Sequence, residues 1–186
     1  MTVATLLRSA VAALDAAGVP FMLTGSLAAA YHGAGRATMD IDLVIDPTAP
    51  QLRALVRALT GTGTYLSSEA AEEALVHRTM FNVIDTTSGW KIDLIVRRDR
   101  AFSTTEFGRR RPAVYEGCAL WVASVEDLIV AKLEWAERGG SARQLEDVAA
   151  LVRIQAEALD REYLERWVVE LGLAPQWRQV SQGDRA

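Results

Sequence analysis

Apolar residues recur along the first part of the chain at spacings that alternate between helical and extended structure. Residues 3–17 carry a stripe with helical spacing, which Gly18 ends. The short apolar run at 20–23 predicts a strand, and residues 27–31 predict the first turns of a helix. Residues 41–45 combine β-branched side chains with an alternating acid, so we expect a second strand there.

The middle of the chain continues this alternation. Residues 50–60 have the pattern of a helix and are followed by a Gly-Thr-Gly turn. The segments 79–84 and 90–96 predict two strands, and the Thr-Thr-Ser-Gly between them indicates a hairpin. The stretch that follows, as far as Pro112, is basic and less regular, and a short strand is expected near 118–122.

The last third of the chain favours helices. Ser124 is a good N-cap for a helix that runs to about Glu137, and Ser141 is expected to cap a second helix. A further helix is predicted over 161–171. The tail over 179–186 is polar and is expected to be flexible.

This order of elements predicts an α/β (α+β) protein, in which a small mixed β-sheet has flanking helices and is followed by a helical C-terminal part. We divide the chain into a sheet-containing domain over 1–122, a helical region over 123–178 that packs on it, and the tail. The 186 residues are enough for one globular domain with such a helical appendage.

Composition narrows the class of protein. No apolar run approaches the roughly 20 residues needed to span a bilayer, so we expect no membrane segment. The N-terminus lacks a basic start followed by an apolar core, and the single cysteine fits a reducing compartment. We therefore predict a cytoplasmic protein.

The charge of the chain argues against broad coating of nucleic acid, because the net charge is −4. Six arginines nevertheless gather in the basic stretch, which leaves two interpretations open: a solvated surface or a local basic groove. These residues are Arg97, Arg98, Arg100, Arg109, Arg110 and Arg111.

Three acidic residues lie on two of the predicted strands, in positions where they could bind a metal ion. Asp40 and Asp42 are two apart on one strand, so they project to the same side. Carboxylates held side by side repel and are stabilised by a cation, and Mg2+ prefers such hard oxygen ligands. Asp93, on a later strand, is placed to bridge a second metal or to accept a proton from an attacking hydroxyl.

A phosphate cradle is the second element of this constellation. Gly25 follows the first strand and would let the backbone approach a phosphate, while Ser26 at a helix start offers a hydroxyl and amide donors. Each feature taken alone is more often a turn or an exposed strand face. Their combination in this order is typical of phosphoryl or nucleotidyl transfer.

The segment Gly25-Ser26, thirteen residues, Asp40-Ile41-Asp42 and the later Asp93 resembles the signature of the DNA polymerase β-like nucleotidyltransferase superfamily. The resemblance covers roughly residues 20–96. It implies that Gly25 and Ser26 hold the nucleotide's β and γ phosphates, and that Asp40, Asp42 and Asp93 hold Mg2+ or Mn2+. The domain over 1–122 would then be the catalytic domain.

A second resemblance lies in the C-terminal half. The segments 127–133 and 143–148 are similar to the AbiEii-like branch, the toxins of type IV toxin–antitoxin systems, in which a helix lysine and a later aspartate join the active site. Lys132 and Asp147 are the corresponding positions, and Glu146 stands where that branch usually has an arginine. Both residues have an alternative interpretation as ordinary helix-surface side chains.

Two further residues near these motifs carry weaker expectations. Arg36 lies in the loop before the metal strand, where it either touches a nucleotide phosphate or is solvated. Trp135 lies on a predicted helix, and we expect it in the core rather than as a platform for a base.

The sequence thus predicts a metal-dependent nucleotidyltransferase that moves a nucleoside monophosphate from an NTP, such as ATP, to an acceptor. The acceptor is left open among RNA such as a tRNA end, a protein hydroxyl and a small molecule, and the resemblance implies a cognate antitoxin as partner. The alternatives are a catalytically inactive nucleotide- or partner-binding module of the same fold, and an unrelated structural protein.

Overall fold

The structure is a computed structural model that describes residues 2–61 and 63–181. Within these residues the chain forms one seven-stranded sheet and nine helices. The strands are β1 (Phe21–Thr24), β2 (Asp40–Ile45), β3 (Thr64–Tyr65), β4 (Met80–Asp85), β5 (Lys91–Val96), β6 (Arg111–Tyr115) and β7 (Cys118–Val122). The helices are α1 (Val3–Ala16), α2 (Gly25–Tyr31), α3 (Ala49–Leu59), α4 (Ser68–His77), α5 (Ala101–Gly108), α6 (Val125–Gly139), α7 (Ala142–Gln155), α8 (Arg161–Glu170) and α9 (Ala174–Ser181).

The sheet is mixed and has the strand order β3-β4-β5-β2-β1-β7-β6. The β2–β5 and β1–β7 pairs are parallel, and the remaining neighbours are antiparallel. The central strands β1, β2 and β5 are largely buried, and Ile41 and Leu43 of β2 are fully enclosed. Two strands far apart in the sequence, β2 and β5, are therefore adjacent at the centre of the sheet.

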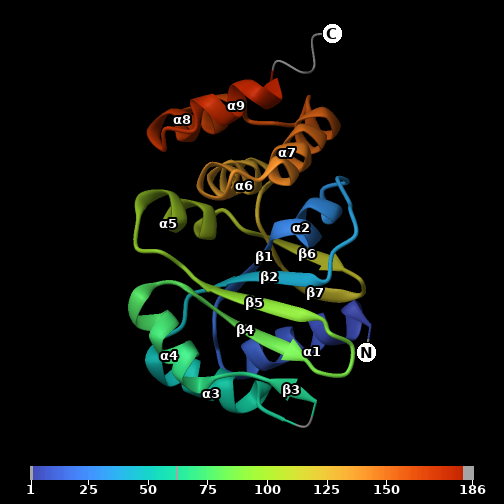
Figure 1. Cartoon of the computed structure of the whole chain (residues 1–186), viewed down its shortest axis with the longest axis vertical. Coiled ribbons are helices and arrows are strands. Elements are labelled where there is room, and N and C mark those ends of the chain that lie inside the picture. The colour runs from blue at the N-terminus through green and yellow to red at the C-terminus, as the bar shows by residue number, and fades with distance from the viewer. Residues whose placement is uncertain (1, 62, 182–186) are drawn as a thin grey trace.

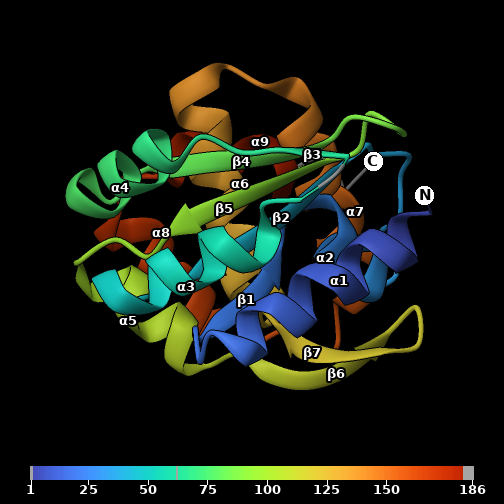
Figure 2. The same cartoon turned by 90° about the horizontal axis from the view of Figure 1, so that it is seen from below.

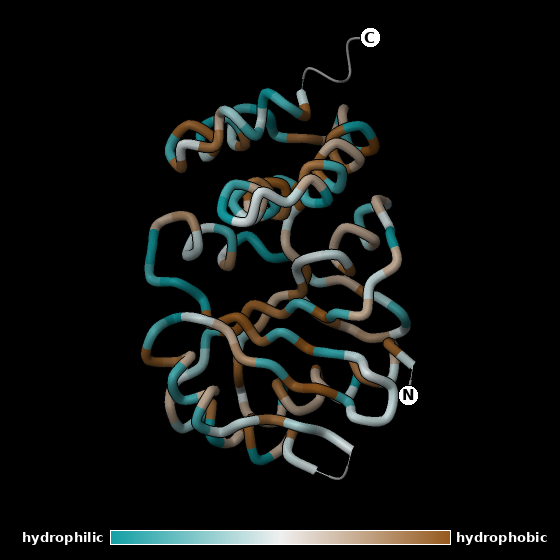
Figure 3. Tube along the Cα trace, viewed as in Figure 1, coloured by the Kyte–Doolittle hydropathy of each residue, from teal (hydrophilic) through white to brown (hydrophobic). Residues whose placement is uncertain are grey.

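Helices cover the two faces of the sheet unequally. In Figure 1, α1, α3 and α4 lie on one side of the sheet, and α6 to α9 lie on the other. The view from below places α1 and α3 directly over the sheet (Figure 2). The hydropathy colouring shows apolar residues concentrated in the central strands, whereas the helices alternate between apolar and polar residues (Figure 3). Among the helices α6 to α9, α6 lies over the strands that carry the acidic residues.

Local signals explain where several of these helices begin. Thr48 and Gln51 form a capping box at α3, and the Ser124 side chain accepts a hydrogen bond from the amide of Asp127 at α6. Ser141 occupies the N-cap position of α7, but its side chain makes no capping hydrogen bond. The expected helix starts are thus confirmed, although the cap at α7 is weaker than expected.

The expected fold class is confirmed, and the antiparallel β4–β5 hairpin forms as predicted. In the described part of the chain, the strands lie between residues 21 and 122, and α6 to α9 follow. The division into a catalytic domain and a helical region stays a prediction. Of the segment expected to be a flexible tail, residues 179–181 belong to α9, and 182–186 lie outside the described residues.

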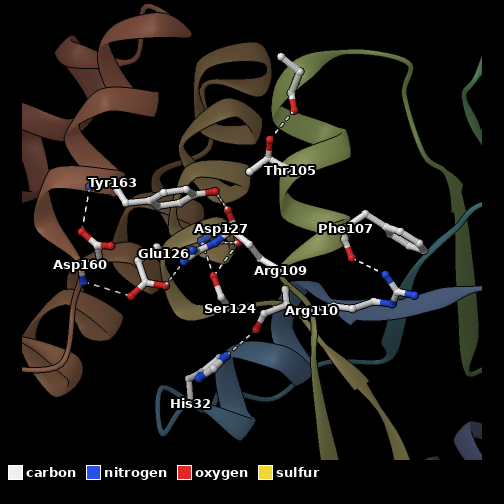
Figure 4. Close-up of polar contacts among 12 residues, drawn as sticks. His32, Thr105, Phe107, Arg109, Arg110, Ser124, Glu126, Asp127, Asp160 and Tyr163 are labelled. Atoms are coloured by element: carbon white, nitrogen blue, oxygen red, sulfur yellow. Dashed lines mark hydrogen bonds and ion pairs between the residues drawn. The ribbon is translucent and has the colours of Figure 1, made fainter.

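A buried polar cluster joins the C-terminal helices to the sheet layer (Figure 4). Asp127 of α6 is completely buried and accepts hydrogen bonds from the side chains of Arg109, Ser124 and Tyr163. Arg109 lies at the end of α5 and Tyr163 lies on α8. Because α6 also carries Lys132, this cluster fixes the position of a predicted site residue.

No helix among residues 2–61 and 63–181 combines the length and apolar character needed to cross a membrane.

Candidate active site

A row of polar residues crosses four adjacent strands of the sheet. Thr24 of β1 pairs with Asp42 of β2, Asp42 pairs with Asp93 of β5, and Asp93 pairs with Asn82 of β4. The next row places Asp40 opposite Lys91. Cross-strand partners have neighbouring Cβ atoms, so the register gathers three carboxylates over one patch of the sheet.

The side chain of Asp42 leaves no room for any residue other than glycine at position 25. The residue has a positive φ of 65°, and a Cβ added to it would overlap the side chain of Asp42. The sequence suggested that Gly25 leaves room for a phosphate. The structure adds that the room next to its Cα is filled by the Asp42 carboxylate.

Asp42 lies at the most crowded point of the site. Burial, then the charge of Asp93 and then that of Asp40 raise its pKa, while the charge of Lys132 and a backbone hydrogen bond from Ser26 lower it.

The Asp93 side chain is held from two sides. Asn82 donates a side-chain hydrogen bond to Oδ1, and the Nζ of Lys91 lies 3.0 Å from Oδ2. The same Nζ lies 3.6 Å from Oδ1 of Asp40. Asp93 is buried, whereas half of the Asp40 side chain is exposed to solvent. Lys91 and Asn82 were not among the residues expected in the site.

Lys132 and Asp147 form a buried pair beside this patch. Lys132 is 2% exposed, and its Nζ donates to Oδ2 of Asp147 at 2.7 Å and to Oε1 of Gln144 at 3.1 Å. Burial lowers the pKa of Lys132, although the hydrogen bond to Asp147 and the charge of Asp147 act in the opposite direction. The Nε of Arg36 also donates to both Asp147 carboxylate oxygens, at 3.0 and 3.1 Å.

These contacts involve two of the expected site residues. Asp147 is engaged by Lys132 and Arg36 and lines neither pocket at the site, and its catalytic role stays a prediction. Arg36, which we considered as a phosphate contact or a solvated side chain, is bound to Asp147. It supplies a guanidinium partner for Asp147 from the α2–β2 loop, whereas the neighbouring position 146 is a glutamate.

All of the predicted site residues except Asp147 line two adjoining pockets. One of them, the sheet–helix pocket, has a volume of about 270 Å³ and lies between the sheet and α6. Its polar lining consists of Thr24, Gly25, Ser26, Asp42, Asp93, Lys132 and Gln144. The second, the loop pocket, has about 440 Å³ and includes Ser26, Arg36, Asp40, Asp42, Arg143 and Gln144. Ser26, Asp42 and Gln144 belong to both pockets.

The prediction that Trp135 belongs to the core is wrong. Trp135 is 46% exposed and lines the sheet–helix pocket together with Met80, which is also exposed. Lys132 of α6 also lines this pocket, and Trp135 lies three residues further along the same helix. An aromatic ring at the rim of such a pocket is available for stacking on a base.

The donor set suits a divalent cation. In the part of the chain that the structure describes, no three His, Cys, Asp or Glu side chains are placed so that they could hold a metal ion together. Mg2+, however, is commonly held by one or two carboxylates with phosphate oxygens and water. Burial and then the charges of Asp93 and Asp40 raise the pKa of Asp42, so a cation bound there would offset the repulsion among these carboxylates.

Three of the six arginines of the basic stretch pair with acids of the protein, which favours a structural role over an open basic groove. Arg97 pairs with Asp46, Arg100 with Glu134, and Arg109 with Glu126 and Asp127. The Arg110 guanidinium lies over the rings of Phe107 and Trp121. These arginines therefore contribute mainly to packing between elements.

Solved structures with the same fold are nucleotidyltransferases or proteins described as similar to them. The solution structure of the antibiotic-resistance factor ANT(2'')-Ia has a TM-score of 0.62 at 18% identity, covering 97% of this chain and 96% of that one. A crystal structure of ANT(2'')-Ia in complex with adenylyl-2''-tobramycin has a TM-score of 0.59 at 17% identity, covering 96% and 99%. An antigenic nucleotidyltransferase-like protein from Paracoccidioides brasiliensis has a TM-score of 0.53 at 18% identity, covering 81% and 76%.

At these identities, the likeness shows the fold. A search of curated proteins gave no match. A family model described as "Nucleotidyl transferase AbiEii toxin, Type IV TA system" matches residues 6–175, which is most of the chain. The sheet, the acidic row and the Lys132–Asp147 pair all fall within that range. The chain therefore belongs to the AbiEii family of nucleotidyltransferase toxins of type IV toxin–antitoxin systems.

Proposed function

We propose that this nucleotidyltransferase moves a nucleoside monophosphate from an NTP to an acceptor in the sheet–helix pocket, with a divalent cation at Asp40 and Asp42. The observation that carries the proposal is the common pocket of Ser26, Asp42, Asp93 and Lys132. A buried ammonium group faces clustered carboxylates there. This arrangement offers both signs of charge to a metal-bound triphosphate.

The protein side chains divide the work of transfer. A cation bound at Asp40 and Asp42 would neutralise charge on the phosphates and orient them for in-line attack. The Lys132 ammonium faces the same pocket and stabilises negative charge that develops on the phosphates. Asp93 is the carboxylate nearest to Asp42 across the sheet, and we assign to it either a share of the metal or the proton of the attacking hydroxyl.

The nucleobase is proposed to stack at the pocket rim. Trp135 and Met80 give the sheet–helix pocket an apolar side, whereas the carboxylates lie on the sheet. A nucleotide placed with its phosphates over Asp42 and its base toward Trp135 would match both surfaces. Stacking of this kind tolerates different bases, so the proposal does not select one NTP.

Three acceptor classes remain to be distinguished: RNA such as a tRNA end, a protein hydroxyl and a small molecule. The ANT(2'')-Ia complex contains adenylylated tobramycin, so aminoglycosides belong among the small molecules to be tested. Membership of a toxin family supports the further proposal that a cognate antitoxin binds the chain or opposes its activity.

The test is to incubate the purified protein with each labelled NTP and Mg2+ or Mn2+, separately with total RNA, cell lysate protein and aminoglycosides. Asp42→Asn serves as the matched inactive variant. A labelled product that forms with the parent and not with Asp42→Asn supports the proposal and identifies the acceptor class. NTP binding without transfer to any acceptor would instead favour the inactive nucleotide-binding module.

A further inference from the structure

Lys91 occupies a position among the site carboxylates that the established family membership does not explain. It lies directly opposite Asp40 in the parallel β2–β5 pair, and it precedes Asp93 by two residues on the same strand. Residues two apart on a strand point to the same side, so Lys91, Asp93 and Asp40 share one face of the sheet. The segment Lys91-Ile-Asp93 thus lies alongside Asp40-Ile-Asp42, with a lysine in place of one aspartate.

The Lys91 ammonium bridges two carboxylates, and within residues 2–61 and 63–181 neither of them pairs with another cationic side chain. Its Nζ lies 3.0 Å from Oδ2 of Asp93 and 3.6 Å from Oδ1 of Asp40. Burial would lower the pKa of Lys91, but the hydrogen bond and charge of Asp93 and the charge of Asp40 outweigh it, so its pKa is raised. Lys91 therefore carries its charge at neutral pH. About one third of its side chain is exposed, which leaves it free to move outward.

We propose that Lys91 is a displaceable counter-ion of the carboxylate site, and that its ammonium group competes with a divalent cation for Asp40 and Asp93. This inference rests on the proposed function, because it concerns the metal assigned to these carboxylates. The physical reason is that an ammonium group and a divalent cation repel each other when both lie next to the same oxygens. The flexible four-carbon stem of lysine allows the ammonium to withdraw.

The proposal explains two properties of the site together. Asp93 is buried, and a buried carboxylate without a cation nearby would be costly in the free protein. Lys91 supplies that cation and keeps the acidic patch stable before a ligand arrives. The same contact lowers the affinity for metal alone, so that tight metal binding requires the additional oxygens of a nucleotide.

The first experiment measures Mn2+ binding to the intact protein by calorimetry, for the parent, for Lys91→Met and for Arg161→Met. Arg161 is an exposed residue at the start of α8, so its variant makes the same change in net charge away from the site. We expect Lys91→Met to bind Mn2+ about three- to tenfold more tightly, the range of one partly buried ion pair. Arg161→Met should match the parent.

The outcomes separate this inference from the proposed function. If the parent and Lys91→Met bind Mn2+ with equal affinity, Lys91 is not a competitor, although the metal site stands. If neither protein binds Mn2+, the assigned metal site is overturned and the counter-ion role falls with it. Thermal unfolding adds a second readout: without metal, Lys91→Met should melt about 2–4 °C lower than the parent, and Mn2+ should reverse the difference.

A third measurement needs no substitution in the protein under study. The chain contains only two lysines, Lys91 and Lys132, so labelling with 13C-lysine gives two side-chain sets of NMR signals. Addition of Mg2+ to the parent protein should shift the Lys91 Cε signal and sharpen it, because the side chain becomes mobile. A Lys91 signal that stays unchanged at Mg2+ concentrations that saturate the site would overturn the proposal.

Discussion

Among single residues, Gly25 is constrained most directly by the site. A Cβ at this position would overlap the Asp42 carboxylate, and the backbone has a φ of 65°, which disfavours any side chain. We expect Gly25→Ala to lower the free energy of unfolding by more than the roughly 1–2 kcal/mol of left-handed backbone strain alone. Urea unfolding measures the difference.

A double variant isolates the contact with Asp42. Asp42→Ala removes the carboxylate that the new methyl group would meet, so Gly25→Ala should cost less stability in that background than in the parent. Transfer should be lost in both single variants and in the double variant. If the two stability losses simply add, the overlap with Asp42 is not the reason for glycine at this position.

Glu106 gives a prediction of pH dependence. It is buried on α5, where burial and the charge of Asp127 raise its pKa to about 8, against the opposing charge of Arg100. The folded protein therefore holds a proton that the unfolded chain releases above pH 4.5, and stability falls as the pH rises from about 4.5 to about 8. Glu106→Gln removes this loss.

The stability gained by Glu106→Gln should be small at pH 4.5, grow up to pH 8 and then level off. Chemical unfolding at pH 5, 7 and 8.5 tests this order, with Glu165→Gln at an exposed position of α8 as the control. A gain that is the same at all three pH values would show that the raised pKa of Glu106 does not govern stability.

The placement of individual residues was predictable only as far as local periodicity reaches. The common side of Asp40 and Asp42 follows from the two-residue repeat of a strand. The pairing of Asp42 with Asp93 depends on which of several strands lies next to β2, and that neighbour comes about fifty residues later. Lys91 escaped notice for the same reason, since its partner Asp40 is fixed by the cross-strand register.

At the scale of elements, α4 and α5 show where the sequence pattern was weak. The buried residues of α4 are two alanines, Ala71 and Ala74, which contribute little to an apolar stripe. In α5, buried Phe102 and Phe107 lie next to buried Ser103 and Glu106. Polar side chains on the inner face hide the helical period that sequence analysis relies on.

Three further elements were also absent from the sequence prediction: β3, β6 and α9. The segment 111–115 contains Pro112 and follows an irregular basic stretch, but β6 is the edge strand of the sheet, where a proline is tolerated because it can lack its amide without breaking the ladder. β3 is only two residues long. The position of a strand at the sheet edge depends on tertiary structure, and a two-residue strand is too short to show a sequence pattern.

The pair of helices α6 and α7 carries the next prediction, because Lys132 and Asp147 hold them together at the site. Asp147→Asn would leave the buried Lys132 ammonium without a carboxylate, and we expect a loss of about 3 kcal/mol in the free energy of unfolding. Glu146→Gln, at the exposed neighbouring position, should be close to neutral. Urea unfolding of both variants tests the contrast.

Variants of Lys132 and Asp147 should affect the free energy of unfolding and the rate of transfer differently. Lys132→Met alone should slow transfer about 10²-fold or more, as the loss of one preorganised donor does elsewhere, while leaving Mn2+ binding nearly unchanged. Lys132→Met combined with Asp147→Leu should recover most of the stability that Asp147→Asn loses, because apolar side chains replace a buried ion pair. Transfer by the double variant should stay low. Single-turnover rates equal to the parent for Lys132→Met would remove Lys132 from the site.

At the scale of the whole molecule, the buried cluster around Asp127 determines how the C-terminal helices sit on the sheet layer. Arg109 donates to Asp127 at 3.0 Å and to Glu126 at 3.2 Å, and its guanidinium lies 3.8 Å from the Tyr163 ring centroid. Tyr163 in turn donates to Asp127, which ties α8 to α6. One arginine thus connects the end of α5 to both helices.

The two ends of this cluster should therefore differ in their effect on activity. Tyr163→Phe removes one hydrogen bond but keeps the ring against Arg109. We therefore expect the free energy of unfolding to fall by about 1–2 kcal/mol, with faster hydrogen exchange confined to α8 and α9.

Arg109→Met leaves Asp127 and Glu126 without their cation and should also loosen α6, which carries Lys132. Exchange in α6 should then rise and transfer should slow, whereas Arg111→Met, at an exposed position of β6, should change neither. Equal exchange in α6 for Arg109→Met and the parent would show that the site does not depend on this cluster.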